Sequence, residues 1–136
     1  MQPKAKSRLV CYRSEEIPCV WDSVKDHIQR ALDQGSDYNL NDILTGLCNK
    51  TMQLWCWQSD CIEGALVTTI QTDDNSKFCL FLALGGKHMT DWIEYLPIVE
   101  EWARGEGCDE MRIYGRISWS RLIGYTIDYA KMSRKL

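Results

Sequence analysis

Histidine, paired cysteines and long apolar runs are scarce in this sequence, and each scarcity excludes a class of protein. Only two of the 136 residues are histidine, and the seven cysteines contain no Cys-x-x-Cys pair, so the usual ligand spacing of a zinc site is absent. No run of eighteen apolar residues occurs, which excludes a membrane-spanning helix. The formal net charge of −3 gives no support for binding nucleic acid through a basic surface. We therefore expect no metal site, no membrane span and no nucleic-acid partner.

The N-terminal segment, residues 1–8, lacks the apolar stretch of a signal peptide. We therefore expect a cytoplasmic protein whose cysteines are reduced thiols. Because seven is an odd number, a disulfide framework could not pair all of them within the chain.

The amino-acid composition is typical of one folded domain. Hydrophobic residues make up 45% of the chain and charged residues 26%, and no repeat or linker divides it. A length of 136 residues gives room for one domain and not two. We expect a single domain over residues 1–136, with six tryptophans as its unusual feature.

The spacing of apolar residues predicts the elements of the first half. Residues 8–13 are typical of a strand, and an amphipathic helix follows from Ile17, with a second, shorter helix after Asn39 or Asn41. From Met52 the period changes to two, which predicts strands at 52–58, 61–71 and 78–84. Tight turns between these strands favour an antiparallel meander.

The second half predicts one strand–helix–strand crossover and a short end. The run Gly85-Gly86-Lys87-His88 breaks the strand pattern, and Thr90 caps a helix that ends at Gly105 and Gly107. A strand at 110–115, a helical turn at 118–123 and a last strand at 125–132 complete the chain. The order is β-α-α-β-β-β-α-β-α-β. It predicts an α/β (α+β) domain with a mixed sheet, in which a right-handed crossover joins parallel neighbours.

This order resembles the GNAT-type N-acetyltransferase superfamily. The motifs that carry the resemblance are the strand 78–84 with its Gly-Gly, the stretch 103–108 (Ala-Arg-Gly-Glu-Gly-Cys) and Gly124-Tyr125 before the last strand. Residues 102–108 and 115–121 look most like a group of small phage-encoded proteins with GNAT-like folds. The cofactor loop departs from the family pattern, because Thr90 and Trp92 stand where the family has small residues.

The resemblance implies acetyl-CoA as the cofactor and a small amine as the acceptor. Backbone amides at a helix N-terminus are unsatisfied donors that can hold a pyrophosphate. The residues implied to contact the cofactor are Leu82, Leu84, Gly85, Gly86, Lys87 and His88. The alternative interpretation of Gly85 and Gly86 is a plain turn between strand and helix.

Two residues are candidates for acid–base chemistry at this site. Tyr114, on the strand beside the implied thioester position, is the candidate general acid, and Glu63 is the candidate base. Each also has a structural interpretation, as a packing tyrosine and as an exposed strand glutamate.

Two functions stay open on these residues. The first is an acetyl-CoA-dependent N-acetyltransferase with a degenerate cofactor loop. The second is a non-catalytic phage protein that uses the fold as a binding scaffold, in the host cytoplasm or as a virion or assembly component. The second function would use Arg116, Trp119 and Arg121, because aromatic residues and arginine dominate the hot spots of protein interfaces.

Overall fold

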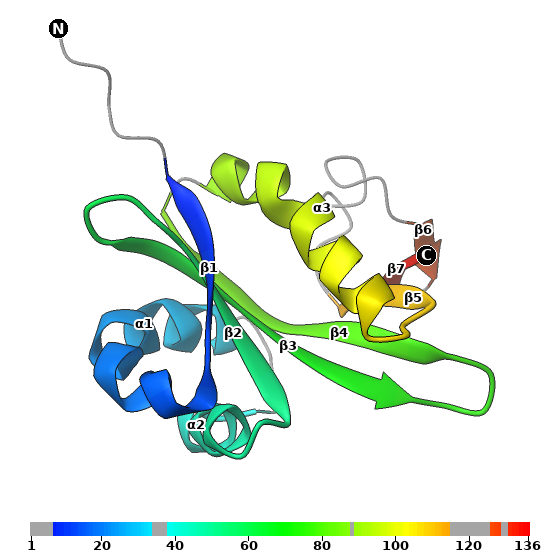
Figure 1. Cartoon of the computed structure of the whole chain (residues 1–136), viewed down its shortest axis with the longest axis horizontal. Coiled ribbons are helices and arrows are strands. Elements are labelled where there is room, and N and C mark those ends of the chain that lie inside the picture. Colours follow the sequence, from blue (N-terminus) through cyan, green and yellow to red (C-terminus); the bar gives the residue numbers. More distant parts are fainter. Residues whose placement is uncertain (1–6, 34–37, 88, 115–125, 129–130) are drawn as a thin grey trace, which may run out of the picture.

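The computed structural model describes residues 7–33, 38–87, 89–114, 126–128 and 131–136. These residues form one sheet whose strands lie in the order β1-β2-β3-β4-β5-β7-β6 (Figure 1). The strands are β1 (Arg8–Tyr12), β2 (Met52–Gln58), β3 (Ile62–Thr72), β4 (Lys77–Gly86), β5 (Glu110–Tyr114), β6 (Thr126–Asp128) and β7 (Lys131–Lys135). The helices are α1 (Ile17–Leu32), α2 (Leu40–Cys48) and α3 (Met89–Gly105), and a 3-10 turn spans Ser14–Glu16.

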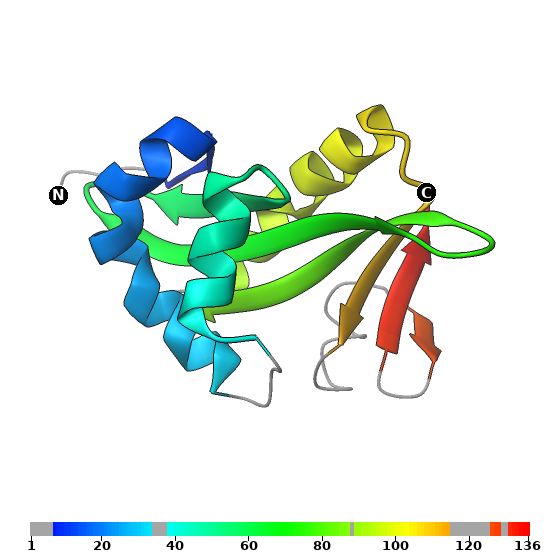
Figure 2. The ribbon, with the colours of Figure 1, turned by 90° about the horizontal axis from the view of Figure 1, so that it is seen from below.

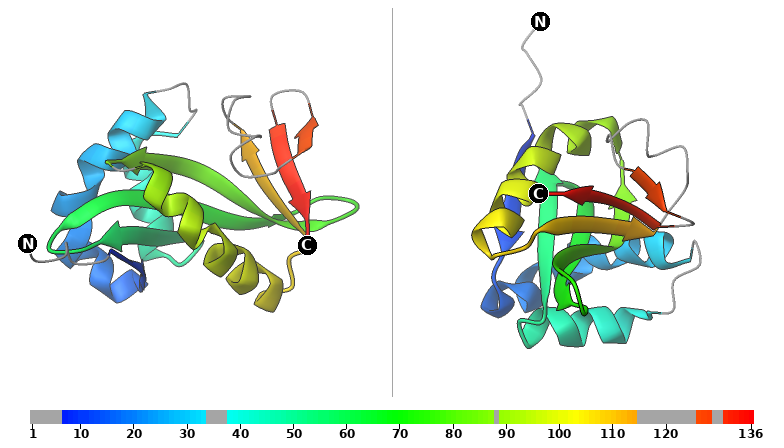
Figure 3. Two further views of the ribbon diagram at one scale, coloured as in Figure 1. Left: turned by 90° about the horizontal axis from the view of Figure 1, so that it is seen from above. Right: turned by 90° about the vertical axis from the view of Figure 1, so that its right-hand side faces the viewer.

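Helices cover both faces of the sheet. α1 and α2 lie on one face and α3 on the other (Figure 1, Figure 3). The α3-side core consists of Trp55, Trp57, Leu66, Cys79, Phe81, Trp92, Leu96, Val99, Ala103, Cys108, Met111 and Ile113. The α1–α2-side core consists of Ile17, Val24, Ile28, Leu32, Ile43, Leu47, Leu54, Cys56, Ala65, Val67 and Ala83. The sheet is therefore a central layer buried from both sides, which explains why β4 is almost wholly apolar.

Local sequence signals account for the two helices on the first face. α1 has Pro18 in its first turn and buries Ile17, Val24 and Ile28 at helical spacing. Asn39 caps α2, because its side chain accepts the Asp42 N–H at 2.8 Å and the Asp42 carboxylate accepts the Asn39 N–H at 3.0 Å. Both predicted helices are confirmed.

The strand predictions are confirmed for the meander and for the crossover. β2, β3 and β4 pair antiparallel, and β4 pairs with β5 in parallel across α3. β2 has the predicted bounds, Met52–Gln58. The predicted helical turn at 118–123 lies outside the described residues.

Two predictions about the second half are wrong. Gly85 and Gly86 do not break the strand, because β4 continues through both residues and pairs them with Ala65 and Gly64. The single last strand at 125–132 is instead two antiparallel strands, β6 and β7, with β7 inserted between β5 and β6. A period of two does not distinguish one strand from two strands that follow each other closely.

An ion-pair network joins the paired ends of β3, β4, β5 and β7. The Glu110 carboxylate, whose side chain is 4% exposed, accepts from Arg112 Nε at 2.6 Å and from Lys135 Nζ at 2.7 Å. Arg112 also reaches Asp73 Oδ2 at 2.8 Å and lies 3.7 Å from the centroid of the Phe78 ring. The network therefore fixes β5 to the β3–β4 hairpin at one end of the sheet.

None of the helices that the structure describes is long and apolar enough to cross a membrane.

Candidate functional site

The candidate site lies where β4 and β5 separate. Their parallel pairing covers only Phe78–Phe81 of β4 and Glu110–Ile113 of β5, whereas β4 continues to Gly86 alongside β3. Figure 2 shows the two strands running apart from their paired ends. Along residues 82–86, β4 has no strand partner on its β5 side within the described part of the chain. Within the described residues, the backbone N–H and C=O groups on that edge are therefore not paired with another strand, as on any open strand edge.

A β-bulge at Leu82 marks the same point. Thr68 pairs with Phe81 and Val67 pairs with Ala83, so Leu82 is an extra residue on β4. Leu82 and Ala83 both pack on the α1–α2 side as a result, and Leu84 returns to the α3 side. The bulge therefore disturbs the regular alternation of β4 exactly one residue after its pairing with β5 ends.

Close packing explains both glycines of the predicted phosphate loop. A Cβ on Gly85 would lie under 3.0 Å from the backbone carbonyl oxygen of His27 in α1. Gly86 has φ of 145°, which strongly favours glycine, and a Cβ there would collide with backbone atoms of β3. The two glycines let α1 and β3 approach the end of β4. The interpretation of these two residues as a plain turn between strand and helix is therefore wrong, because both belong to β4.

Lys87 follows directly after the strand. Its N–H donates to the Glu63 carbonyl at 2.7 Å, and its carbonyl accepts from Trp57 Nε1 at 3.0 Å. These bonds hold the Lys87 backbone, while its side chain is exposed. α3 begins two residues later at Met89, so an ammonium group stands just before the N-terminus of a helix. His88 lies outside the described residues.

The structure does not bring the two candidate acid–base residues together. Tyr114 ends β5, one residue past the Ile113–Phe81 pair, which places its backbone near the level of Leu82. The backbone carbonyl of Glu63 accepts the Lys87 N–H, and Lys87 lies five residues after Leu82, just beyond the end of β4, a separation of roughly 16 Å along an extended chain. The Glu63 carboxylate accepts from the Ser59 hydroxyl at 3.1 Å, within the β2–β3 connection. Glu63 and Tyr114 therefore do not form one pair at a single reacting centre.

Trp92 packs inward from α3. Its side chain is 5% exposed, and its ring meets Phe81 edge-on with centroids 6.3 Å apart. It is therefore part of the α3-side core. The residues of the predicted interface, Arg116, Trp119 and Arg121, lie outside the described residues.

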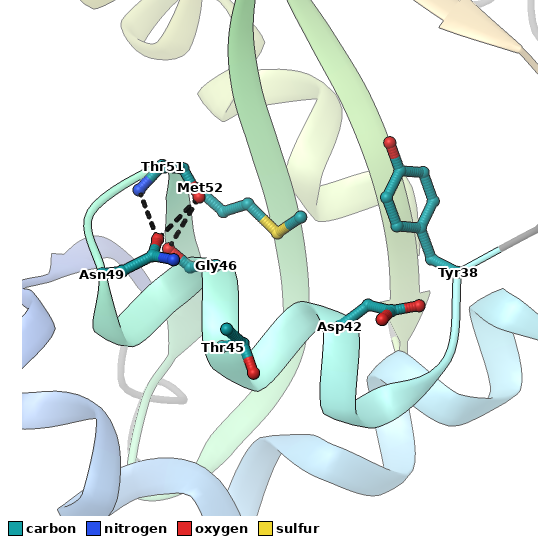
Figure 4. A pocket seen from close by; sticks show the side chains of 7 residues that line it. All are labelled: Tyr38, Asp42, Thr45, Gly46, Asn49, Thr51 and Met52. Carbon is teal, nitrogen blue, oxygen red and sulfur yellow. Dashed lines mark hydrogen bonds between the residues drawn. The ribbon is translucent and has the colours of Figure 1, made fainter.

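A groove along α2 was not predicted from the sequence. It has a volume of about 540 Å³ and is lined by Tyr38, Asp42, Thr45, Gly46, Asn49, Thr51 and Met52 (Figure 4). We call it the α2 groove. Asp42, Thr45 and Gly46 of α2 and Asn49, the residue directly after it, are spaced i, i+3, i+4 and i+7, so they form one stripe along the helix. In sequence such a stripe looks like the solvated face of any amphipathic helix, and only the neighbouring Tyr38 and Met52 make it concave.

Among the described residues, no group of three or more histidine, cysteine, aspartate or glutamate side chains is arranged to hold a metal ion.

No protein-family model matches the chain, and no curated protein matches it. Solved structures do. A predicted acetyltransferase from Clostridium acetobutylicum with acetyl-CoA is 8% identical, with a TM-score of 0.67 over 90% of this chain and 92% of that one. The PaiA N-acetyltransferase from Thermoplasma acidophilum with coenzyme A is 14% identical, with a TM-score of 0.62 over 95% and 99%. A GNAT family acetyltransferase from Brucella melitensis with acetyl-CoA is 13% identical, with a TM-score of 0.63 over 95% and 88%. The chain therefore has the mixed α/β fold of the GNAT acetyltransferases, as its order of elements predicts.

Proposed function

We propose that this protein binds acetyl-CoA along the open edge of β4 and transfers the acetyl group to an amine. The observation that carries the proposal is the end of β4–β5 pairing at Phe81, while β4 continues for five residues beyond it. Solved structures with this fold hold acetyl-CoA or coenzyme A, which supports the same cofactor here.

The residues present fit such a cofactor. An extended chain that contains amides can pair with an open strand edge, and residues 82–86 offer one. Leu82 and Leu84 are half-buried and can border the chain on opposite faces of the sheet, and the exposed Lys87 ammonium can meet phosphate charge before α3. When bound, acetyl-CoA supplies an activated thioester. The protein's own residues supply a fixed backbone edge and a cation.

The acid–base assignments remain proposals. We assign Tyr114 as the group that returns a proton to the leaving thiolate, because its backbone lies near the level of the Leu82 bulge. We do not propose Glu63 as the base, since it lies nearer to Lys87 than to Leu82 and so not within hydrogen-bond reach of the proposed reacting centre.

Calorimetric titration with acetyl-CoA tests the proposal directly. We expect saturable binding, and we expect Lys87→Ala to weaken it about fivefold or more through loss of a phosphate contact. Lys25→Ala is the matched control, because Lys25 lies on α1 and pairs with Asp22 at 3.2 Å. If no heat of binding is detected at millimolar acetyl-CoA, the proposal is wrong.

Hydrogen exchange locates the bound cofactor. We expect acetyl-CoA to slow the exchange of amides at residues 82–86 and to leave those of β1, the outer strand at the other side of the sheet, unchanged. Equal protection of both regions would contradict binding at the β4 edge. The alternative, a phage scaffold in a virion, stays a prediction, because its interface residues are outside the described part of the chain.

A further inference from the structure

We propose that two copies of this chain associate through the outer edge of β1, with the two β1 strands antiparallel about a two-fold axis at Val10. β1 is an outermost strand of the sheet, and among the described strands it pairs only with β2. Figure 1 shows it on the opposite side of the molecule from β5 and β7. Because β2 and β3 lie between β1 and β4, the association leaves the open edge of β4 free and does not depend on acetyl transfer.

The outer edge of β1 lacks the features that commonly prevent strands from pairing between molecules. Its five residues contain no proline and no lysine, and its register with β2 runs from Arg8 to Tyr12 without a bulge. The three central residues, Leu9, Val10 and Cys11, carry no formal charge. A regular strand with an uncharged centre and an unpaired row of backbone N–H and C=O groups is a template for another strand.

A stripe of large side chains on α3 borders this edge. Tyr95, Ile98 and Trp102 are spaced i, i+3 and i+7, so they lie along one side of the helix. The Tyr95 hydroxyl is hydrogen-bonded to the hydroxyl of Ser7, the residue before β1, and the Trp102 ring meets Trp55 of β2 edge-on with centroids 5.2 Å apart. Ile98 stands between these two contacts and is 52% exposed, the only exposed large hydrophobic residue that the structure describes. A strand added beside β1 extends the sheet on this side of α3, where it can cover Ile98.

One antiparallel register matches β1 to a second copy of itself. With Val10 opposite Val10, Leu9 of each copy opposes Cys11 of the other, and Arg8 of each copy opposes Tyr12 of the other. The centre of the pair is therefore apolar, and no two like charges face each other. Arginine beside an aromatic ring is itself a favourable contact.

The charges on either side of β1 favour the same antiparallel arrangement. The sequence before the strand is basic, with Lys4 and Lys6, whereas Glu15 and Glu16 follow the strand, with side chains that are 63% and 42% exposed. Arg13 contacts both glutamates and offsets one of the two negative charges. In an antiparallel pair the beginning of one strand lies beside the end of the other, so the basic segment of each copy meets the acidic turn of the other. A parallel pair would bring like charges together.

The small size of the surface predicts a weak dimer. Five paired residues form few backbone hydrogen bonds, and an isolated pair of strands is marginally stable in water. Burial of Leu9, Cys11 and Ile98 adds to this pairing. We therefore expect a dimer with a Kd of about 10–100 μM.

Sedimentation velocity of the full chain at about 5 μM and about 500 μM tests the association, because these concentrations lie on either side of the expected Kd. Dithiothreitol is present so that the exposed cysteines cannot crosslink. We expect a monomer at the lower concentration and a dimer at the higher one. Cys11→Lys should weaken the dimer at least about tenfold, because it places an ammonium group at the centre of the paired edge. Cys11 is exposed, so circular dichroism should show that this variant is folded.

Gln71→Lys is the matched control, because it adds the same charge at an exposed strand position beside the distant β3–β4 turn. This variant should dimerise like the unmodified chain. A chain that stays monomeric at about 500 μM overturns the association and leaves the β1 edge to an extended segment of a different protein. A dimer that folded Cys11→Lys retains at full strength uses another surface, and this result also overturns the proposal.

A crosslink tests the register in a second variant, which decides the question if Cys11→Lys does not fold. In the double variant Val10→Cys with Cys11→Ser, the new thiols of the two copies face each other across the two-fold axis. After mild oxidation without dithiothreitol and digestion with trypsin, we expect mass spectrometry to find the peptide of residues 9–13 linked to a second copy of itself. Val20→Cys with Cys11→Ser is the control, because Val20 lies on α1 and not on the edge. Equal self-linkage in both variants, or none at residue 10, would overturn the pairing about Val10.

Discussion

Gly85→Ala tests whether Gly85 serves packing or a phosphate loop. In the structure, a Cβ at this position would lie under 3.0 Å from the His27 carbonyl oxygen and 3.4 Å from the Ala31 Cβ. The obstacle is backbone in the middle of α1, so no change of rotamer can relieve it. To restore ordinary contact, α1 and β4 must separate by about 1 Å.

That displacement sets the expected cost. Overpacking a buried contact costs about 1–3 kcal/mol, and we expect the upper part of this range because α1 carries four buried core residues, which would shift together. A loss of about 2–3 kcal/mol is a large part of the stability of a small domain. Urea unfolding followed by tryptophan fluorescence measures it.

The matched control is Gly105→Ala. Nothing lies within 4 Å of a Cβ built on Gly105, the last residue of α3, so this variant should be neutral or slightly more stable. A loss below 1 kcal/mol in Gly85→Ala would refute the packing role. If acetyl-CoA binding were lost at the same time without loss of stability, Gly85 would belong to a cofactor loop instead.

Three further predictions concern charge and thiols. Arg112→Met should lower the free energy of unfolding by about 3 kcal/mol in urea denaturation, because it leaves the buried Glu110 carboxylate with Lys135 as its one ion-pair partner among the described residues. A loss under 1 kcal/mol would show that water already solvates Glu110. Burial alone would raise the pKa of Glu110, but hydrogen bonds from Lys135 and Arg112 hold this pKa below its ordinary value of 4.5. The contribution of Glu110 to stability is therefore present above pH 4.5 and is lost as the pH falls through the pKa of the folded state. Glu110→Gln should therefore flatten the loss of stability in acid, and an unchanged acid profile would contradict the role of this carboxylate. Burial raises the pKa of Cys56, the nearby Cys11 raises it further, and together they bring it to about 12. Iodoacetamide at pH 8.5 should therefore leave Cys56 unmodified in the folded protein while it labels the exposed Cys61. Rapid labelling of both cysteines would show that the core opens.

The meander could be predicted because its signals are local. In β2 the side chains of Trp55 and Trp57 alternate with Leu54 and Cys56, and the two pairs enter the cores on opposite faces. Asn39 begins α2 through bonds to a residue three positions later. Period and capping both depend on neighbours in the chain, so the sequence contains them directly.

The environment of the glycines could not be predicted, because it depends on contacts across the fold. Gly86 is opposite Gly64, and a Cβ on Gly64 would overlap the indole of Trp57. Nothing local distinguishes such glycines from those of a loop. The ion pair between Arg112 and Asp73, which are 39 residues apart, likewise could not be predicted from local spacing.

The candidate site was predicted in part. The strand that carries Leu82 and Leu84 does border the point where β4 and β5 separate. The bulge that re-aims Leu82 leaves no mark in the sequence, since one extra apolar residue in an apolar strand does not change the pattern. The α2 groove was missed because Asp42, Thr45 and Asn49 look like ordinary solvated helix residues.

Trp92 shows why alignment to a family motif does not by itself decide whether a cofactor can bind. By alignment it stands where the family has a small residue, which suggests an obstruction at the helix N-terminus. In the structure its ring packs edge-on against Phe81, the last β4 residue paired with β5, and a void of only about 10 Å³ remains beside it. The indole therefore fills the core behind the point of separation. A buried ring in that core does not occupy the edge at residues 82–86, so tryptophan at this position is compatible with an open β4 edge. Whether the protein binds acetyl-CoA therefore depends on that edge and not on Trp92.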